Sequence, residues 1–222
     1  MEEFLYPHFY EVENTHWWFA ARQRILWEFM ERKLRFPATL RLLDVGCGTG
    51  AILDMLSKKY HAYGQDVAPQ AIAFCAQRGL QHLFCGTLDR FPSTEEQFDI
   101  ITSFDVIEHI DDDLGTLRQM YNLLQDNGTL LVTVPAFPSL WGTHDVVTHH
   151  KRRYVRRTLT SVVEQAGFRV EYLSYFNFFL FPIAVVRRLL TRWSNPAESE
   201  DYTGQQQFRK QGIERKSIHP SR

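Results

Sequence analysis

Short apolar runs and amphipathic stretches alternate along most of this 222-residue chain. Apolar runs predict strands at residues 41–45, 61–66, 82–85, 98–104 and 129–134, and apolar positions at helical spacing predict helices at 51–59, 69–78 and 112–124. A last helix is expected at 158–166, with a strand after it at 168–174. Because strands that alternate with helices are typical of a parallel sheet covered on both faces, the expected fold class is α/β, a doubly wound and mainly parallel sheet.

A helical stripe precedes the first strand, and a polar segment ends the chain. Residues 15–35 place tryptophan and aliphatic side chains on one face with charged residues between them, which predicts an added N-terminal helix. Residues 195–222 are polar and have few apolar positions, so we expect disorder there. We therefore expect one domain over residues 1–194, including an N-terminal helical cap at 1–37.

Composition narrows the class of protein. A hydrophobic content of 44% is enough for one sizeable core, and a net charge of -1 argues against bulk electrostatic binding of nucleic acid. The three cysteines lack the CxxC spacing of metal ligands, which indicates reduced thiols. Since the N-terminus has no basic region followed by an apolar run, we expect a cytoplasmic protein.

The most apolar segment lies toward the C-terminus. Residues 176–192 are first apolar and then basic, and the apolar part is about half of the ~20 residues that a membrane span requires. That order suits a peripheral contact with a membrane, with the cations near anionic head groups. It also suits a core strand and helix packed under the N-terminal helix. The sequence makes no prediction of the oligomeric state.

Residues 42–50, Leu-Leu-Asp-Val-Gly-Cys-Gly-Thr-Gly, carry the clearest chemical signal. Glycines let the backbone turn sharply and pass close to a ligand, and the helix behind them directs its first N–H groups at the same place. Gly46, Gly48 and Ala51 also match the G-x-G-x-x-A spacing of some dinucleotide dehydrogenases. Asp44, however, would repel a pyrophosphate and attract a cationic amino-acid group. Charge therefore favours S-adenosylmethionine over NAD.

Ordered motifs from about residue 40 to 175 make the chain resemble the class I S-adenosylmethionine-dependent methyltransferases. The resemblance implies that the glycine-rich loop binds the methionine part of the cofactor and that the aspartate of "GQDVAP" binds the ribose hydroxyls, while a helix N-cap remains the other interpretation of that aspartate. The cofactor-binding residues expected on this basis are Asp44, Gly46, Cys47, Gly48, Gly50, Asp66, Val67, Thr87, Leu88 and Phe104.

The chain departs from this family's pattern in three places. Gly86-Thr87-Leu88 stands where many relatives carry an aspartate that binds the adenine amino group, so adenine recognition is expected here by position only. Asp126-Asn127-Gly128 replaces the usual Pro-Gly-Gly turn before the fifth strand. No apolar run near the C-terminus corresponds to the customary seventh strand.

Two regions after the fourth and fifth strands are candidates for chemistry, because ligands of open parallel sheets bind beyond the carboxyl ends of the strands. His109, in the run 105–109 (Asp-Val-Ile-Glu-His), is a candidate general base or only a packing residue. The same run is similar to the metal-binding pattern of small-RNA 2'-O-methyltransferases, with His144 or His149 as the later ligand. We expect no metal, since many relatives carry "EH" here with no metal known.

The second region, residues 141–157, combines a dense run of Lys and Arg with histidines and aromatic side chains. Such a run suits a phosphate or carboxylate on the acceptor, or it forms a solvated loop and helix face. His144 is the second catalytic candidate. The expected substrate-binding residues are Trp141, His149, Arg152, Arg153 and Tyr154.

The sequence therefore predicts an enzyme that transfers a methyl group from S-adenosylmethionine to a small or lipid-linked acceptor, with oxygen as the expected acceptor atom. Positioning supplies most of the rate in such a transfer, and a general base helps only where the acceptor must lose a proton. The alternatives are a metal-dependent nucleic-acid 2'-O-methyltransferase, a non-catalytic cofactor-binding protein of the same fold, and a nucleotide dehydrogenase.

Overall fold

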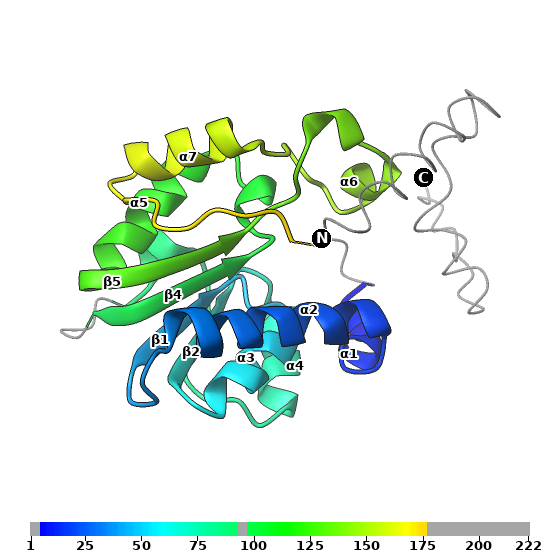
Figure 1. Cartoon of the computed structure of the whole chain (residues 1–222). Helices are drawn as coiled ribbons and strands as arrows, with labels where there is room; N and C mark the ends of the chain where they lie inside the picture. Colours follow the sequence, from blue (N-terminus) through cyan, green and yellow to red (C-terminus); the bar gives the residue numbers. More distant parts are fainter. Residues whose placement is uncertain (1–4, 93–96, 177–222) are drawn as a thin grey trace.

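A computed structural model describes residues 5–92 and 97–176, and it contains a five-stranded, all-parallel sheet (Figure 1). The strand order is β3-β2-β1-β4-β5. The strands are β1 (Arg41–Val45), β2 (His61–Asp66), β3 (Leu83–Cys85), β4 (Phe98–Phe104) and β5 (Leu124–Thr133). The predicted α/β fold class is confirmed, and the carboxyl ends of all five strands meet at one edge of the sheet.

Helices cover both faces of this sheet, as Figure 1 shows. On one face lie α2 (Trp17–Glu28), the π-helical η1 (Phe29–Leu34), α3 (Ala51–Ser57) and α4 (Pro69–Gln77), and on the other lie α5 (Asp113–Leu123) and α7 (Arg156–Gln165). The remaining helices are α1 (Leu5–Val12), α6 (Thr143–Val147) and the 3-10 turns η2 (Leu88–Arg90), η3 (Ile107–His109) and η4 (Pro138–Leu140). The expected N-terminal helix is thus α2 with η1, and α1 is an additional helix in front of it.

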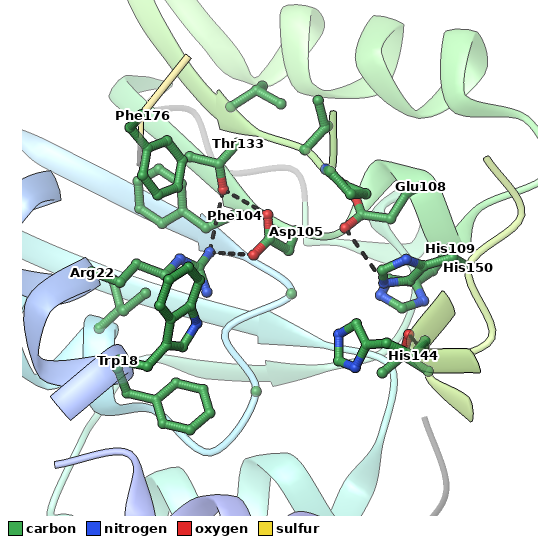
Figure 2. Close-up of a pocket in the computed structure, with 18 of the residues that line it drawn as sticks. Trp18, Arg22, Phe104, Asp105, Glu108, His109, Thr133, His144, His150 and Phe176 are labelled. Carbon is green, nitrogen blue, oxygen red and sulfur yellow. Dashed lines mark hydrogen bonds and ion pairs between the residues drawn. The ribbon is translucent and has the colours of Figure 1, made fainter. Parts of the chain in front are cut away.

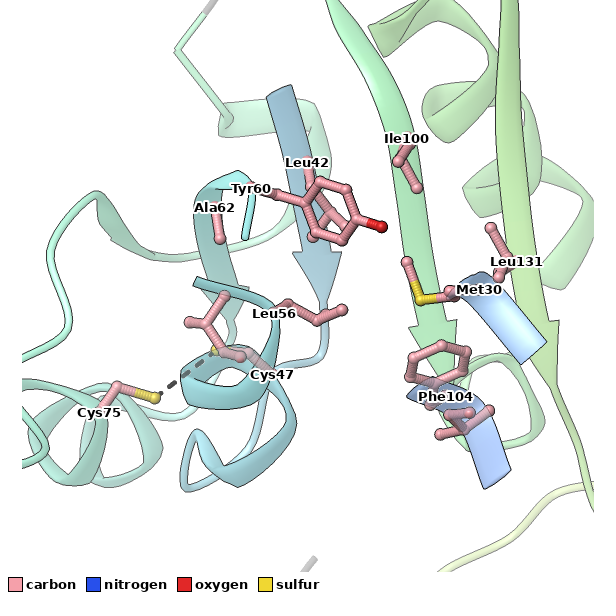
Figure 3. Packing of buried hydrophobic residues seen from close by; sticks show 12 residues of the cluster. Met30, Leu42, Cys47, Leu56, Tyr60, Ala62, Cys75, Ile100, Phe104 and Leu131 are labelled. Carbon is pink, nitrogen blue, oxygen red and sulfur yellow. Dashed lines mark hydrogen bonds between the residues drawn. The ribbon is translucent and has the colours of Figure 1, made fainter. Parts of the chain in front are cut away.

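Alternating strand residues build a separate hydrophobic core on each face. Leu42 of β1 and Ile100 of β4 pack with α2, η1, α3 and α4, as Figure 3 shows. Their chain neighbours Leu43 and Ile101 point to the other face, where they pack with α5 and α7. All four side chains are fully buried. Strands buried on both faces read as continuous apolar runs, which is why the sequence located them well.

Residues 168–174 do not form the predicted strand. Their aromatic side chains contact other elements instead: Tyr172 packs against Phe29 of η1, with ring centroids 5.2 Å apart, and Phe168 packs against Tyr121 of α5 at 5.1 Å. The segment is anchored by side chains and does not pair with β5. The apolar pattern that predicted a strand here reflects those contacts.

The fifth strand begins earlier than predicted, at Leu124, and contains the Asp-Asn-Gly turn as an irregularity. Phe98 pairs with Leu124 while Ile100 pairs with Thr129, so the intervening residues of β5 bulge out of register. Asn127 has a φ of +65° within the bulge. This conformation suits Asn better than most residues, so the departure from Pro-Gly-Gly still allows a tight turn.

The predicted polar tail at 195–222 and all but the first residue of the apolar-basic segment at 176–192 lie outside the described residues. Within the described part of the chain, no helix combines the length and the apolar character needed to cross a membrane.

Candidate functional site

A cavity of about 840 Å³ opens at the carboxyl edge of the sheet. Its walls come from α1 and α2, from the glycine-rich loop after β1, and from the segments that follow β4 and β5. Its size is within the range of small-molecule sites. Of the residues expected from the sequence, the cavity lining includes Asp44, Gly46, Cys47, Gly48, Phe104, His109, His144, Arg153 and Tyr154. The expected residues that do not line it are Gly50, Asp66, Val67, Thr87, Leu88, Trp141, His149 and Arg152.

The first two positions of the loop are glycine for different structural reasons. Gly46 has a φ of +72°, and a Cβ there would lie 2.5 Å from Cγ2 of Val106, so protein packing requires glycine. Gly48 has a φ of +56°, yet a Cβ there would meet no atom within 4 Å. Gly48 also lines the cavity. The position that leaves room for a ligand is therefore Gly48, whereas Gly46 lets the backbone pass the segment after β4.

Asp44 lies at the end of β1 with its side chain in the cavity lining. It is buried, and its Oδ1 accepts a hydrogen bond of 2.6 Å from the Thr102 hydroxyl of β4. Burial raises the pKa of Asp44 to about 7, although the Thr102 hydrogen bond and the positive charge of Arg22 oppose that rise. A buried carboxylate with so little compensation is well suited to receive a cationic group.

Asp66 holds the glycine-rich loop against the start of α4. Its Oδ2 accepts from the backbone N–H of Gly48 and its Oδ1 from that of Ala68, both at 2.9 Å. The N-cap residue of α4 is Ala68, so Asp66 is not the N-cap itself. Burial raises the pKa of Asp66, and the backbone hydrogen bonds oppose that effect. Each carboxylate oxygen retains a lone pair for a further donor.

The other expected cofactor residues lie around this carboxylate. Val67 is 63% exposed just after β2, Thr87 is exposed, and Leu88 is buried at the start of η2. Gly50 is the N-cap of α3, where a Cβ would lie 2.8 Å from Sγ of Cys75. Cys47 packs beside the same thiol, with the two sulfur atoms 3.8 Å apart (Figure 3).

The N-terminal segment is fastened directly to the glycine-rich loop, which the sequence did not predict. The Glu13 carboxylate accepts from the Thr49 hydroxyl and pairs with the guanidinium of Arg78. Arg78 Nε also donates to the Thr49 carbonyl at 2.7 Å, and its guanidinium lies 4.3 Å from the centre of the Tyr10 ring. Burial raises the pKa of Glu13. The segment that follows α1 therefore closes one side of the cavity.

A second ionic contact joins α2 to the ends of two strands (Figure 2). Arg22 Nη2 lies 2.8 Å from Asp105 Oδ2 and 3.2 Å from the Thr133 hydroxyl, which itself donates to Asp105 Oδ1 at 3.0 Å. The sequence contains one signal for this contact: Arg22 is a charged residue within the apolar stripe of the N-terminal helix. Its carboxylate partner lies 83 positions further along the chain and could not be read from the sequence.

Imidazoles and a buried carboxylate form the wall opposite α2. His109 and His150 have ring centroids 4.7 Å apart, and the His144 ring lies 5.8 Å from that of His150. Burial and the neighbouring His150 lower the pKa of His109 to about 4. Loss of contact with water and the neighbouring His150 also lower the pKa of His144, although the residue as a whole is exposed. Glu108 is fully buried, and burial raises its pKa to about 8, with Asp105 adding to the effect.

The basic run contributes less free charge than the sequence suggested. Arg152 pairs with Asp113 at 2.9 Å, and Arg153 makes contacts of 2.6 and 3.0 Å with the two oxygens of Asp145. The Tyr154 hydroxyl donates to Asp113 at 2.7 Å. Both guanidinium groups are thus paired with carboxylates, which favours a structural role. Anion binding by this run stays a prediction that these contacts do not support.

Two further expected residues lie on the outside of this region. Trp141 is 37% exposed after η4, and His149 is exposed with a φ of +58°. His150, which nothing in the sequence favours over its neighbour, is the histidine that turns into the cavity. The backbone N–H of Lys151 donates to the Glu108 carbonyl at 2.8 Å, so the backbone next to His150 is joined to η3.

Comparison with known proteins gives three further findings. The model of a family described as "Methyltransferase domain" matches residues 12–173. The ubiquinone biosynthesis O-methyltransferase of Ruegeria pomeroyi is 34% identical over 97 residues, which are 41% of this chain and 39% of that protein. A probable S-adenosylmethionine-dependent methyltransferase of Mycolicibacterium smegmatis is 25% identical over 167 residues, 72% of this chain and 62% of that protein. The matches span less than two thirds of either relative.

Among solved structures, the N-methyltransferase NodS from Bradyrhizobium japonicum, in complex with S-adenosyl-L-homocysteine, superposes with a TM-score of 0.54. The match is 19% identical and covers 68% of this chain and 76% of that chain. At this level of identity the likeness supports the fold.

Proposed function

The chain belongs to the methyltransferase domain family, in the class that uses S-adenosylmethionine, and we propose that it methylates a hydroxyl oxygen of a small or lipid-linked acceptor. One observation carries the proposal. The glycine-rich loop with Asp44 and the wall of imidazoles line the same cavity. A cofactor bound at the loop would thus present its methyl group toward groups able to receive a proton.

The cofactor part of the proposal rests on charge and space. Asp44 offers a buried carboxylate to the cationic methionine group, and Gly48 leaves open space beside it. Asp66, fixed by two backbone N–H groups, is available for the ribose hydroxyls. We propose that the other cofactor residues expected from the sequence line the path between these two carboxylates, with Phe104 beside the cofactor.

An apolar or lipid-linked acceptor fits the rest of the cavity. Its aromatic lining comes from α1, from α2, from the end of β4 and from Phe176, and Trp18 lies beside Arg22 in Figure 2. Oxygen as the acceptor atom is supported by the curated relative from Ruegeria pomeroyi, whose name describes an O-methyltransferase. The paired guanidinium groups of the basic run give no support to a nucleic-acid acceptor.

We propose His144 as the general base. Its lowered pKa keeps the imidazole neutral near pH 7, and a neutral imidazole can accept the proton of a hydroxyl. His109 was the other candidate, but a pKa of about 4 makes it a weak base at neutral pH.

A methyl-transfer assay with labelled S-adenosylmethionine tests this proposal. Phenols and catechols, with and without a prenyl chain, are compared with amines and carboxylic acids of similar size. We expect label in the hydroxyl acceptors, and a kcat lower by roughly 10²- to 10⁴-fold in His144→Gln. His61→Gln, a change in an exposed histidine at the start of β2, is the matched control. Transfer to amines alone, or an unchanged kcat in His144→Gln, would contradict the proposal.

A further inference from the structure

The Glu108 carboxylate is buried without a hydrogen-bond partner among the described residues. It has 0% relative exposure, and neither Oε1 nor Oε2 has a hydrogen-bond partner within the described structure. Removing an ionised carboxylate from water without donors is costly, so a buried one normally binds a cation, a donor or a proton. The imidazole of His150 lies close by, but its Nε2 is 4.0 Å from Oε1, too far for a hydrogen bond (Figure 2).

Three potential ligand atoms converge at this point. One atom each from Glu108, His109 and His150 lie within 4.8 Å of one another. Two of these residues come from η3, directly after β4, and the third from the segment after α6. Backbone hydrogen bonding between Lys151 and Glu108 joins these segments, so the convergence belongs to the framework.

The orientation of the His150 ring is fixed by a contact at Nδ1, on the side away from Glu108. Its Nδ1 lies 2.8 Å from Oδ1 of Asp145, and that carboxylate is held by Arg153 and by the backbone N–H of Gly142 at 2.7 Å. An acceptor at Nδ1 selects the tautomer in which Nδ1 carries the proton, and this leaves the Nε2 lone pair facing Glu108. A carboxylate behind a histidine is the usual support of a metal-binding imidazole.

We propose that Glu108, His109 and His150 bind one divalent transition-metal ion, with Zn²⁺ or Co²⁺ preferred over Mg²⁺. Two imidazoles and one carboxylate match a tetrahedral metal that keeps an open position, whereas Mg²⁺ prefers oxygen ligands. This revises the ligand set considered from the sequence. Asp105 is paired with Arg22, and His150 takes the place considered for His144 or His149.

The open position of the ion would face the cavity, because all three ligands line it. A hydroxyl oxygen bound there would lose its proton more readily, since a metal ion lowers the pKa of a bound hydroxyl or water. Activation of an acceptor hydroxyl by the ion rests on the proposed O-methylation, whereas binding of the ion is independent of it.

Calorimetric titration of the full, tag-free chain with Zn²⁺, Co²⁺ and Mg²⁺, after removal of metal by a chelator, tests the site. A Cys85→Ser background excludes the exposed thiol as a ligand. We expect one Zn²⁺ per chain, visible d–d absorption of tetrahedral Co²⁺, and weaker binding of Mg²⁺. Glu108→Gln and His150→Gln should lose the site, and Asp145→Asn should weaken binding by about 10- to 100-fold.

His61→Gln is the matched control, because it removes an exposed imidazole from the opposite edge of the sheet. Thermal unfolding of each variant shows whether it folds. The proposal is wrong if the wild-type chain binds no Zn²⁺ or Co²⁺, or if folded Glu108→Gln and His150→Gln bind them as wild type does. Methyl transfer is measured separately: transfer without metal binding would overturn this site alone, and metal binding without transfer would overturn the proposed function alone.

Discussion

For Asp44, folding favours the protonated carboxyl group, whereas the proposed cofactor binding requires the ionised one. Its pKa is raised from 3.8 to about 7 because it is buried. The folded protein therefore binds this proton more tightly than the unfolded chain does. It follows that the contribution of Asp44 to stability is greatest below pH 4 and is lost as the pH rises through about 7. A cationic ligand, in contrast, requires the ionised form.

Asp44→Asn separates the two demands. At pH 8 we expect the ligand-free variant to melt at a higher temperature than wild type, because no buried charge forms. Affinity for S-adenosylmethionine should fall roughly ten- to hundredfold, as expected for losing a charge-assisted hydrogen bond. Calorimetry from pH 6 to pH 8 should show affinity rising with pH in wild type and constant in the variant. Equal pH dependence in both proteins would show that another group controls binding.

The glycines illustrate what a motif reveals about single residues. The sequence correctly marked a turn that only glycine could form, but it could not assign each glycine its reason. Gly46 avoids the side chain of Val106, which lies 60 positions further along the chain, while Gly48 borders open space. Local chemistry predicted the loop, and the tertiary neighbours decide which glycine has open space beside it.

Among the elements, the N-terminal cap departs most from expectation. A single helix was expected at 15–35, whereas the structure has α1, α2 and the wider η1 in succession. Charged contacts fasten the cap: Glu13 bonds to Thr49 in the glycine-rich loop, and Arg22 bonds to Asp105 beyond β4. These pairs connect residues that are far apart in sequence. Periodicity alone therefore predicted a helix, but it could not predict where the helix packs or that it lines the cavity.

Weakening the Glu13 contacts should loosen the N-terminal segment from the glycine-rich loop and from Arg78. Glu13→Gln removes the charge that pairs with Arg78 and leaves a buried guanidinium without its carboxylate. We expect a loss of about 1–3 kcal/mol of unfolding free energy in urea, together with weaker cofactor binding. Glu28→Gln breaks the exposed pair with Arg32 and should change stability by only about 0.5 kcal/mol. Equal effects of the two substitutions would contradict a cap held by Glu13.

Strands were predicted better than other elements because buried parallel strands have a continuous apolar pattern. The same pattern misled at 168–174, where the rings of Phe168 and Tyr172 contact α5 and η1 without backbone pairing and the segment stays partly exposed. Apolar periodicity reports side-chain contact, which a segment can make without joining a sheet.

Taken as one molecule, the chain brings the glycine-rich loop and the imidazole wall to one edge of its sheet. The glycine-rich loop is contiguous in sequence, so the residue pattern at 44–50 was enough to predict its turn. The imidazole wall joins η3 to the segment after α6, about 40 positions apart, and its key member His150 was overlooked beside His149. What the sequence could not supply was the packing that selects among adjacent residues of the same type.

Calorimetric binding of S-adenosyl-L-homocysteine to wild type and to Asp66→Asn, with NAD as the control ligand, is the direct test that this fold binds S-adenosylmethionine through the second carboxylate. The substitution keeps one oxygen acceptor but replaces the other oxygen, which accepts a backbone N–H, by an amide donor. We expect one bound molecule per folded wild-type chain, affinity reduced roughly tenfold or more in Asp66→Asn, and no binding of NAD. Binding of NAD, or equal affinity in wild type and a folded variant, would contradict this expectation.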